Sequence, residues 1–379
     1  ANAKTVPMLK GYYKTPEDKI KVVAEGESIS LGTCTLSFHM IPMVHWPETM
    51  VTWLAEEGTL FSGDAFGTFG AVEGGIVNAE GTFEEYRDEM IRYYSNIVGK
   101  YGAPVQQALK KLGGLDIKRV CSTHGPVWET NIAQVVALYD RMSRYDVDRG
   151  VCIVYGSMYG NTAAAADALA MELEARGIPY AIHDLAGNNA GELGVSGAIR
   201  DAFKYDTIVA GSPTYNNGIF PPVETFMRAL KARQVKGRRF YAFGSYTWAG
   251  ASVKQLNALA GEMGFEVLGD GMSFPQAYTS EKCNMAAVAD LLILLHGDLS
   301  IPLESGVGLG NEPGCGNGDA HTAGLIGSIF LPGEVDLAGQ IGNTQNILVG
   351  FGGQTQHEVQ LYAVPAAGKG GADGLQQIL

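Results

Sequence analysis

The sequence of 379 residues contains no apolar run long enough to cross a membrane. A membrane-spanning helix needs about 18 or more consecutive apolar residues, and the most apolar stretch, residues 286–295, is too short. Positive charge is also scarce, because the sequence has 27 Lys and Arg residues but 40 Asp and Glu residues, which gives a net charge of −13. A basic patch is the usual footprint of a nucleic-acid-binding protein. We therefore expect neither a membrane nor a nucleic acid as a partner.

Cysteine pairs and a secretion signal are also missing. The five cysteines are scattered, and none of them forms a C-x-x-C pair. This usage is typical of buried thiols in a reducing compartment, and it excludes an iron centre held by paired C-x-x-C knuckles. No signal-peptide pattern opens the chain. These absences predict a cytoplasmic protein.

Residues 151–176 read as a strand, a polar turn and a helix in succession. The β-branched run at 151–155 predicts a buried parallel strand, and the Ala-, Leu- and Glu-rich stretch at 163–176 predicts a helix. The turn between them carries hydroxyl groups and glycine. Backbone N–H groups at a helix N-terminus favour an anion, so we expect a phosphate site here. A tight turn with an Asn-Thr cap is the simpler alternative.

The turn matches neither of two common phosphate-binding loops. It lacks the G-x-G-x-x-G spacing of dinucleotide-binding proteins and the Gly-Lys-Ser/Thr of a Walker A loop. Residues 205–218 and 240–250 each read as a further strand that ends in a polar loop, the second with aromatic side chains at its mouth. Three such loops at the carboxyl ends of parallel strands surround the crevice of a doubly wound sheet. This arrangement resembles the flavodoxin fold, which binds FMN.

The resemblance to flavodoxin assigns three FMN-binding loops. The first would bind the phosphate, the second would lie beside the ribityl chain and the ring, and the third would complete the site. For the exposed tryptophan of the third loop, a packing role is the alternative. The matched residues are Ser157, Met158, Tyr159, Gly160, Asn161, Thr162, Pro213, Thr214, Tyr215, Asn216, Asn217, Gly218, Ser245, Tyr246, Thr247, Trp248, Ala249 and Gly250.

Before residue 150, three potential metal ligands follow predicted strands or loops: His45, Asp64 and His124. Imidazole suits iron and zinc, and a carboxylate can bridge two metals. Their spacing alone is not a signature, because a histidine after a strand is more often a hydrogen-bonded loop residue and an isolated aspartate is more often a turn or a cap. The residues that flank these three side chains carry more information.

Short motifs around the three candidates resemble the second half of a metallo-β-lactamase-like domain. They are H-W-P-E-T-M at 45–50, S-G-D-A-F-G at 62–67 and S-T-H-G-P at 122–126. Followed by a flavodoxin-like domain, this half-domain resembles the flavodiiron proteins, from the first residue to about residue 295. The resemblance implies FMN and two non-haem irons, with His45 and His124 each on one metal and Asp64 bridging them. It also implies an enzyme that reduces nitric oxide to nitrous oxide, dioxygen to water, or both.

The same resemblance implies partners. Electrons would reach FMN from a small donor, either a rubredoxin-like protein or a reduced cofactor. Subunits would pair head to tail, as a homodimer or as a tetramer made of two dimers. In this arrangement the FMN of one subunit would lie near the iron site of the other.

One part of the family pattern is absent from the sequence, namely its first ligand cluster, His-x-Glu-x-Asp-His. Three ligands cannot saturate two irons, and a single carboxylate leaves about one negative charge against roughly four positive ones, which is costly when buried. We therefore expect this chain to bind iron weakly and to show no turnover beyond that of free flavin. We also expect exposed apolar surface where the absent strands would pack.

The expected organisation is a partial metallo-β-lactamase-like αββα domain at 1–148, a flavodoxin-like doubly wound parallel sheet at 149–295 and a glycine-rich tail at 296–379. The tail has 19 glycines in 84 residues and three possible short strands, and its Cys315, His321 and His357 match no ligand spacing. His183 reads as a solvent-facing or core-edge imidazole. Periodicity predicts further strands at 22–30, 33–40, 59–64, 116–122, 179–185 and 265–268, and helices at 6–13, 83–112, 133–145, 224–232, 253–263 and 280–295.

Two alternatives to a flavodiiron enzyme stay open at this point. The first is an electron-transfer flavoprotein that binds FMN and uses the incomplete metal half as a scaffold. The second is a zinc hydrolase of the β-lactamase fold, which would also need the absent histidine cluster and would leave the three FMN-type loops without a purpose.

Overall fold

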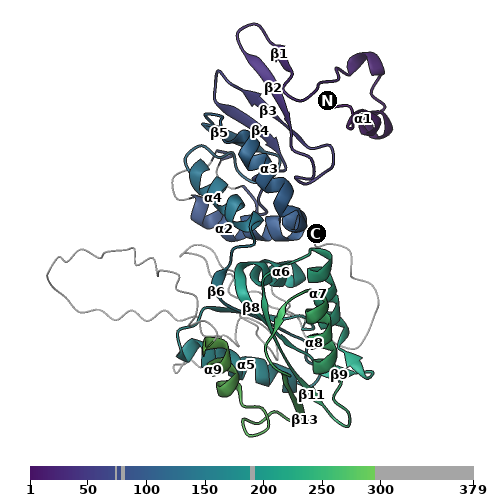
Figure 1. Cartoon of the computed structure of the whole chain (residues 1–379), viewed down its shortest axis with the longest axis vertical. Helices are drawn as coiled ribbons and strands as arrows, with labels where there is room; N and C mark the ends of the chain where they lie inside the picture. The colour runs from purple at the N-terminus through teal and green to yellow at the C-terminus, as the bar shows by residue number, and fades with distance from the viewer. Residues whose placement is uncertain (73–74, 78–81, 188–192, 295–379) are drawn as a thin grey trace, which may run out of the picture. The chain divides into compact units, whose positions relative to one another are not determined.

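The computed structural model describes residues 1–72, 75–77, 82–187 and 193–294, which lie in one compact unit. They form two lobes, each built around its own sheet (Figure 1). The tail, with the short strands and the candidate ligands considered there, lies outside the described residues. Among the helices that are described, none is long and apolar enough to span a bilayer.

The first lobe contains a five-stranded sheet in the order β1-β2-β3-β4-β5. The first four strands pair antiparallel, as consecutive strands with short connections can, and β5 pairs parallel to β4 because two helices intervene. The expected strands are therefore present, but the first is shorter than predicted. The strands are β1 (Ser28–Ser30), β2 (Thr35–Met40), β3 (Met50–Leu54), β4 (Thr59–Gly63) and β5 (Arg119–Ser122).

Helices cover one face of this sheet. Val51, Leu60 and Val120 are fully buried on the covered face, because apolar residues alternate along each strand. On the other face, Phe61 pairs with Thr52 and Cys121 across the neighbouring strands, and it is 44% exposed. Apolar side chains thus remain accessible on the uncovered face.

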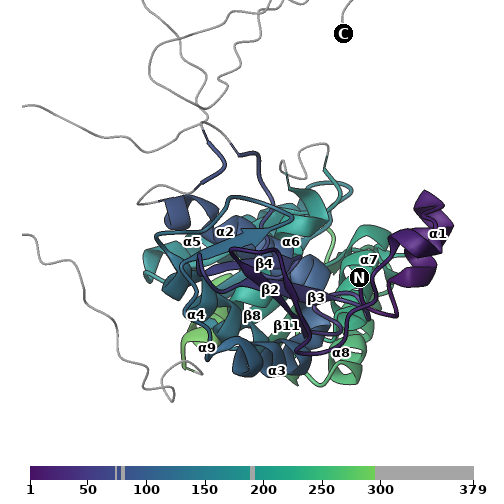
Figure 2. The ribbon, with the colours of Figure 1, turned by 90° about the horizontal axis from the view of Figure 1, so that it is seen from above.

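The helices of the first lobe correct one prediction. The stretch at 83–112 is not a single helix, because a π turn (Tyr94–Val98) and a 3-10 turn (Gly99–Tyr101) separate α2 from α3. Two glycines at this break have low helix propensity. Helix α1 buries none of its side chains and projects from the margin of the lobe (Figures 1 and 2). The helices are α1 (Val6–Tyr13), α2 (Thr82–Tyr93), α3 (Gly102–Leu112) and α4 (Ile132–Ser143), with a short 3-10 turn at Glu17–Lys19.

The second lobe is built on a parallel sheet in the order β12-β11-β8-β6-β7, with β13 also beside β11. Strand β6 has neighbours on both sides, β7 and β8, so the chain direction across the sheet reverses there, as in a doubly wound fold. The strands are β6 (Asp148–Tyr155), β7 (Tyr180–Asp184), β8 (Tyr205–Gly211), β11 (Arg239–Tyr246), β12 (Glu266–Val267) and β13 (Met272–Pro275), and a small hairpin holds β9 (Thr214–Tyr215) and β10 (Gly218–Ile219).

Within the described residues, five helices surround this sheet, and one of them was not predicted. Helix α6 begins with the residues G-V-S-G, which have weak helix propensity. The strand predicted at 265–268 covers only two residues, and the proline-ended β13 that follows was missed. Strand β6 begins at Asp148, earlier than the strand predicted at 151–155, and the last helix begins at Met285, later than predicted. The helices are α5 (Asn161–Ala175), α6 (Gly194–Lys204), α7 (Pro221–Ala232), α8 (Ser252–Glu262) and α9 (Met285–Leu294).

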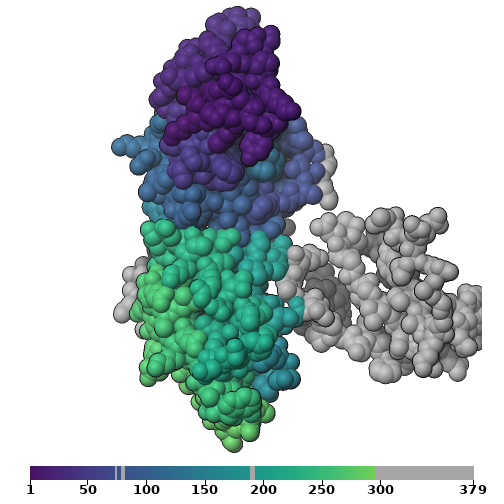
Figure 3. Space-filling view, turned by 90° about the vertical axis from the view of Figure 1, so that its right-hand side faces the viewer, coloured from purple at the N-terminus to yellow at the C-terminus, as the bar shows by residue number. Residues whose placement is uncertain are grey.

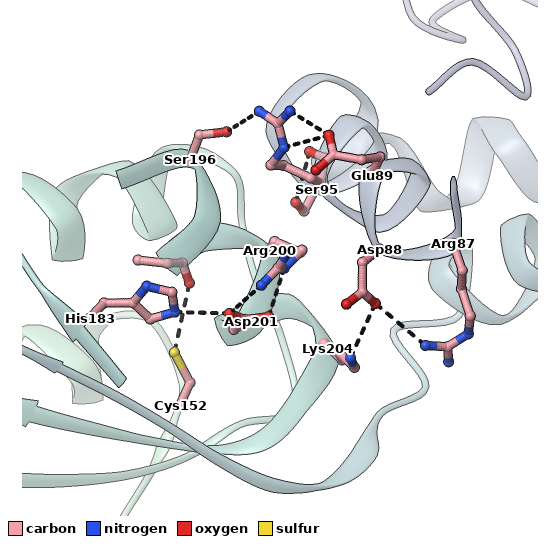
Figure 4. Close-up of polar contacts among 12 residues, drawn as sticks. Arg87, Asp88, Glu89, Ser95, Cys152, His183, Ser196, Arg200, Asp201 and Lys204 are labelled. Carbon is pink, nitrogen blue, oxygen red and sulfur yellow. Dashed lines mark hydrogen bonds and ion pairs between the residues drawn. The ribbon is translucent and has the colours of Figure 1, made fainter. Parts of the chain in front are cut away.

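Polar contacts between α2 and α6 join the two lobes (Figure 4). Arg92 donates to the Ser196 hydroxyl at 3.3 Å, and Asn96 donates to the Ser196 carbonyl at 3.1 Å. Lys204 pairs with Asp88 at 3.2 Å. The space-filling view shows the lobes in direct contact (Figure 3). These contacts orient α6 against the first lobe.

Apolar side chains from both lobes belong to one buried cluster. The ring centroids of Tyr94 and Phe203 lie 5.8 Å apart, with Tyr94 fully buried and Phe203 1% exposed. The buried guanidinium of Arg238 donates to the carbonyls of Ala202, at 2.9 Å, and Phe203, both in α6, and to that of Lys236 at 2.6 Å. Arg238 therefore satisfies backbone acceptors at the end of α6, where helix carbonyls have no partner within the helix.

His183 lies at the edge of the core, in agreement with one of its two sequence interpretations. Its Nε2 atom is 2.8 Å from Asp201, which is 2% exposed and also accepts from Arg200 at 2.8 and 2.9 Å (Figure 4). Burial would raise the pKa of Asp201, but the hydrogen bonds from His183 and Arg200 hold it below its ordinary value.

Candidate functional site

The first candidate loop connects β6 to α5. Gly160 forms the N-cap of α5 with a φ of +82°, a left-handed conformation that glycine adopts without strain. Because Gly160 has no side chain, it cannot cap the N–H groups of the first helical turn. The Ser157 Oγ atom is covered, and it has no hydrogen-bond partner among the described residues. A covered hydroxyl without a partner beside open helix N–H groups is suited to an anionic ligand.

Thr162 links the first loop to the third. Its Oγ1 atom lies 3.0 Å from the Ser245 Oγ atom, and the two residues are 1% and 8% exposed. The sequence suggested that this hydroxyl faces a phosphate, whereas the structure directs it to Ser245. Each of the two hydroxyls keeps hydrogen-bonding capacity beyond this contact.

The second loop is a tight hairpin between β9 and β10. Asn216 and Asn217 form its turn with φ values of 47° and 57°, which is the pair of positive angles that a type I′ turn requires. Asparagine tolerates this conformation better than most residues. The turn therefore presents two amide side chains at the carboxyl end of β8.

A pocket of about 290 Å³ lies between the second and third loops. Small-ligand sites typically begin at about 300 Å³. The Trp248 side chain is 90% exposed at the mouth of this pocket, so its indole ring is available to a flat ligand. The lining residues are Thr214, Asn216, Asn217, Thr247, Trp248 and Ala249, all of which were matched from the sequence.

The three candidate metal ligands come together in the first lobe. The Nε2 atoms of His45 and His124 lie 3.2 and 3.5 Å from the two carboxylate oxygens of Asp64. Asp64 follows β4 and His124 follows β5, so the parallel pairing of these strands brings both residues to one edge of the sheet. Thr123 donates to the Asp64 carboxylate at 2.7 Å.

These residues do not by themselves provide a metal centre. Within residues 1–72, 75–77, 82–187 and 193–294, no group of three or more His, Cys, Asp or Glu side chains is arranged to hold a metal ion. The Asp64 oxygens face two imidazoles and the Thr123 hydroxyl. Two imidazoles and one carboxylate do not fit a pair of irons without further ligands.

Two residues near this cluster were not identified as candidates from the sequence. Thr123 could have been found, because it precedes His124 in the same motif. Tyr93 carries no sequence signal, yet its ring centroid lies 5.5 Å from that of His124. Its hydroxyl is covered and has no partner among the described residues. Burial, together with the nearby Asp64 carboxylate, raises the pKa of Tyr93.

Comparison with known families matches both lobes. Residues 2–125 match the ODP family beta lactamase, and residues 153–291 match flavodoxin. The two matches follow one another in the order that the sequence motifs indicated.

Among curated proteins, the chain is 30% identical over 271 residues to an uncharacterized protein from Methanocaldococcus jannaschii, covering 71% of this chain and 67% of that protein. It is 32% identical over 266 residues to the anaerobic nitric oxide reductase flavorubredoxin of Vibrio vulnificus, covering 68% of this chain and 52% of that protein. The match thus spans about half the length of the flavorubredoxin.

Solved structures also match most of the chain. The rubredoxin oxygen:oxidoreductase of Desulfovibrio gigas superimposes with a TM-score of 0.71 at 25% identity, covering 79% of this chain and 75% of that one. The flavodiiron protein of Giardia intestinalis superimposes with a TM-score of 0.71 at 24% identity, covering 77% and 73%. From the paired lobes, the motifs and these relatives, the chain belongs to the flavodiiron protein family.

Proposed function

We propose that the chain is an FMN-dependent oxidoreductase of the flavodiiron type, with the flavin held by the three loops of the second lobe. The observation that carries this proposal is the covered Ser157 hydroxyl, which lacks a partner among the described residues beside the open N-terminus of α5. A phosphate oxygen would accept its hydrogen bond.

Each loop has a distinct task in this proposal. Ser157 and the first N–H groups of α5 bind the phosphate. The Asn216–Asn217 turn forms one wall of the ring pocket, and Trp248 forms the opposite wall and shields one ring face from water. When bound, FMN supplies one- and two-electron redox chemistry.

The finer proposal concerns the reaction. The nitric oxide reductase and oxygen oxidoreductase relatives favour nitric oxide or dioxygen as the substrate, with a rubredoxin-like protein or a reduced cofactor as electron donor. Reduction of these molecules in the family uses two irons, for which His45, Asp64 and His124 would supply part of the ligands. Further ligands and a head-to-tail homodimer or tetramer belong to the same proposal, as does a lobe boundary near residue 148.

One observation favours a second candidate, an FMN electron-transfer protein without metal chemistry. The Asp64 carboxylate accepts a hydrogen bond from Thr123, and no metal-holding group occurs in the described part of the chain. A lobe of this kind would act as a scaffold for the flavin lobe.

The experiment is an FMN titration of the chain, combined with iron analysis and measurement of nitric oxide and dioxygen consumption. Stoichiometric FMN with about two irons per chain and rapid consumption would support the reductase. Stoichiometric FMN without iron would support the electron-transfer protein, and absence of FMN binding would refute both. In the reductase, Asp64→Ala should lose iron and leave the flavin spectrum unchanged, because the two sites lie in separate lobes.

A further inference from the structure

The first turn of α8 is capped by a side chain from a different loop. Ala251, at the N-cap of α8, provides no side-chain cap. Instead, the N–H groups of Ala251 and Ser252 donate to the Thr214 Oγ1 atom at 3.0 and 3.3 Å. Thr214 lies in β9 of the second loop, 37 residues before Ala251. One hydroxyl therefore joins the second loop to the helix that follows the third.

The Thr214 hydroxyl is fully used by the protein. A threonine hydroxyl can donate one hydrogen bond and accept two. Thr214 accepts both backbone donors and donates to the Ser252 Oγ atom at 3.3 Å, and Ser252 in turn donates to the Ser212 carbonyl at 2.8 Å. No capacity remains on this hydroxyl for a ligand, even though Thr214 lines the pocket.

A second contact ties the same helix to the same loop. Gln255, one turn into α8, donates to the Asn217 carbonyl at 3.0 Å. A side chain at Gly244 would come within 2.2 Å of the Ser212 carbonyl and 2.9 Å of the Ser252 hydroxyl, so the close approach of these groups requires glycine there. The start of α8 is thus held against the second loop by two separate contacts, one from Thr214 and one from Gln255.

The consequence for the pocket follows from its two walls. Asn216 and Asn217 form one wall, and Thr247, Trp248 and Ala249 form the other. Trp248 is 90% exposed, so packing does not hold it. The backbone of the third loop is instead fixed where it enters α8, two residues after Ala249.

We propose that Thr214 is a positioning residue that sets the separation of the two pocket walls by capping α8 across the loops, and that it does not hydrogen bond to the flavin through its hydroxyl. This inference rests on the proposed FMN site for its functional meaning. The cap itself belongs to the protein without a ligand, so it can be tested separately.

The test compares Thr214→Val, which removes the hydroxyl but keeps the shape, with Thr214→Ser, which keeps the hydroxyl. Amide hydrogen exchange at Ala251 and Ser252, measured in the protein without flavin, should accelerate about tenfold or more in Thr214→Val and stay near the wild-type rate in Thr214→Ser. Thr207→Val is the matched control, because it removes a buried hydroxyl that donates to Asp206 at 3.0 Å. Thr207 lies near the start of β8, whereas Thr214 follows the end of that strand. It should leave these two amides unchanged.

The second part of the test measures FMN affinity and the flavin midpoint potential. Thr214→Val should raise the FMN dissociation constant about five- to tenfold and shift the flavin midpoint potential, whereas Thr214→Ser should restore both values. Unchanged exchange at Ala251 and Ser252 in a folded Thr214→Val would overturn the inference, and so would a loss of affinity in Thr214→Ser as large as that in Thr214→Val. If the wild type binds no FMN, the proposed function fails, and the exchange arm still decides whether Thr214 caps α8.

Discussion

Removal of the Ser157 hydroxyl should change stability in opposite directions with and without flavin. The Ser157 Oγ atom is covered and has no partner among the described residues, so the protein without ligand carries the desolvation penalty of an unpaired polar group. Ser157→Ala removes that penalty. With flavin bound, the same substitution removes a hydrogen bond to a charged phosphate.

The two magnitudes come from the same geometry. An unsatisfied buried hydroxyl costs about 1–3 kcal/mol, so Ser157→Ala should raise the free energy of unfolding of the ligand-free protein by about 1 kcal/mol. A hydrogen bond to a charged group contributes about 1.5–3 kcal/mol, so the FMN dissociation constant should rise by a factor of about 10–100. At FMN concentrations well above both dissociation constants, the affinity loss exceeds the gain, and the variant should be less stable than wild type.

Urea unfolding with and without saturating FMN measures the change in the free energy of unfolding of each form, and flavin fluorescence gives the FMN dissociation constant. Ser143→Ala is the control, because its hydroxyl is buried but fully paired, accepting from Gln106 at 2.6 Å and donating to the Asp140 carbonyl at 2.7 Å. It should destabilise both forms equally and leave FMN affinity unchanged. If Ser157→Ala destabilises the ligand-free protein as Ser143→Ala does, the hydroxyl is paired in solution and the argument for an anion site fails.

Three further substitutions should have measurable effects. Thr162→Ala loses the contact with Ser245, so unfolding with and without FMN should show a loss of about 1 kcal/mol without flavin, and titration should show a further loss of roughly 1–3 kcal/mol in FMN binding; unchanged affinity would remove Thr162 from the site. Asp201→Asn should lower stability by about 2–3 kcal/mol at pH 7. Because the pKa of Asp201 is held below its ordinary value, this stabilisation is present above about pH 4 and lost as the pH falls through the folded-state pKa, so the stabilities of wild type and variant should converge in acid; a gap that does not narrow as the pH is lowered would contradict this. Arg238→Met leaves backbone carbonyls of α6 unpaired and should lower the free energy of unfolding, measured in urea, by about 3 kcal/mol. An unchanged free energy of unfolding would mean that water replaces the guanidinium.

Local patterns predicted the elements around the proposed flavin site well. The β-branched run before Ser157 and the alanine-rich helix after it are continuous in sequence, so composition alone locates β6 and α5. The Asn216–Asn217 turn has the residue type that its positive φ values need. Helix α6 and strand β13 were missed, because glycine and proline weaken their local signal and tertiary contacts stabilise them.

Local sequence patterns did not predict contacts between distant segments, although the family resemblance had placed His45, Asp64 and His124 at one site. The spacing of His45, Asp64 and His124 carries no information about distance, and only the parallel pairing of β4 with β5 explains why two of them share one edge. The cap that Thr214 provides to α8 joins two loops that are separate in sequence. Motif matching predicted a flavin contact at Thr214 but could not assign the direction of its hydroxyl.

The common core of the two lobes makes the apparent boundary near residue 148 a poor place to divide the protein. Tyr94 and Phe203 come from different lobes, yet each is buried by a cluster that includes the other. Separate expression of either lobe would expose aromatic rings that the intact chain hides from water. The lobes should therefore melt cooperatively in calorimetry, as a single transition.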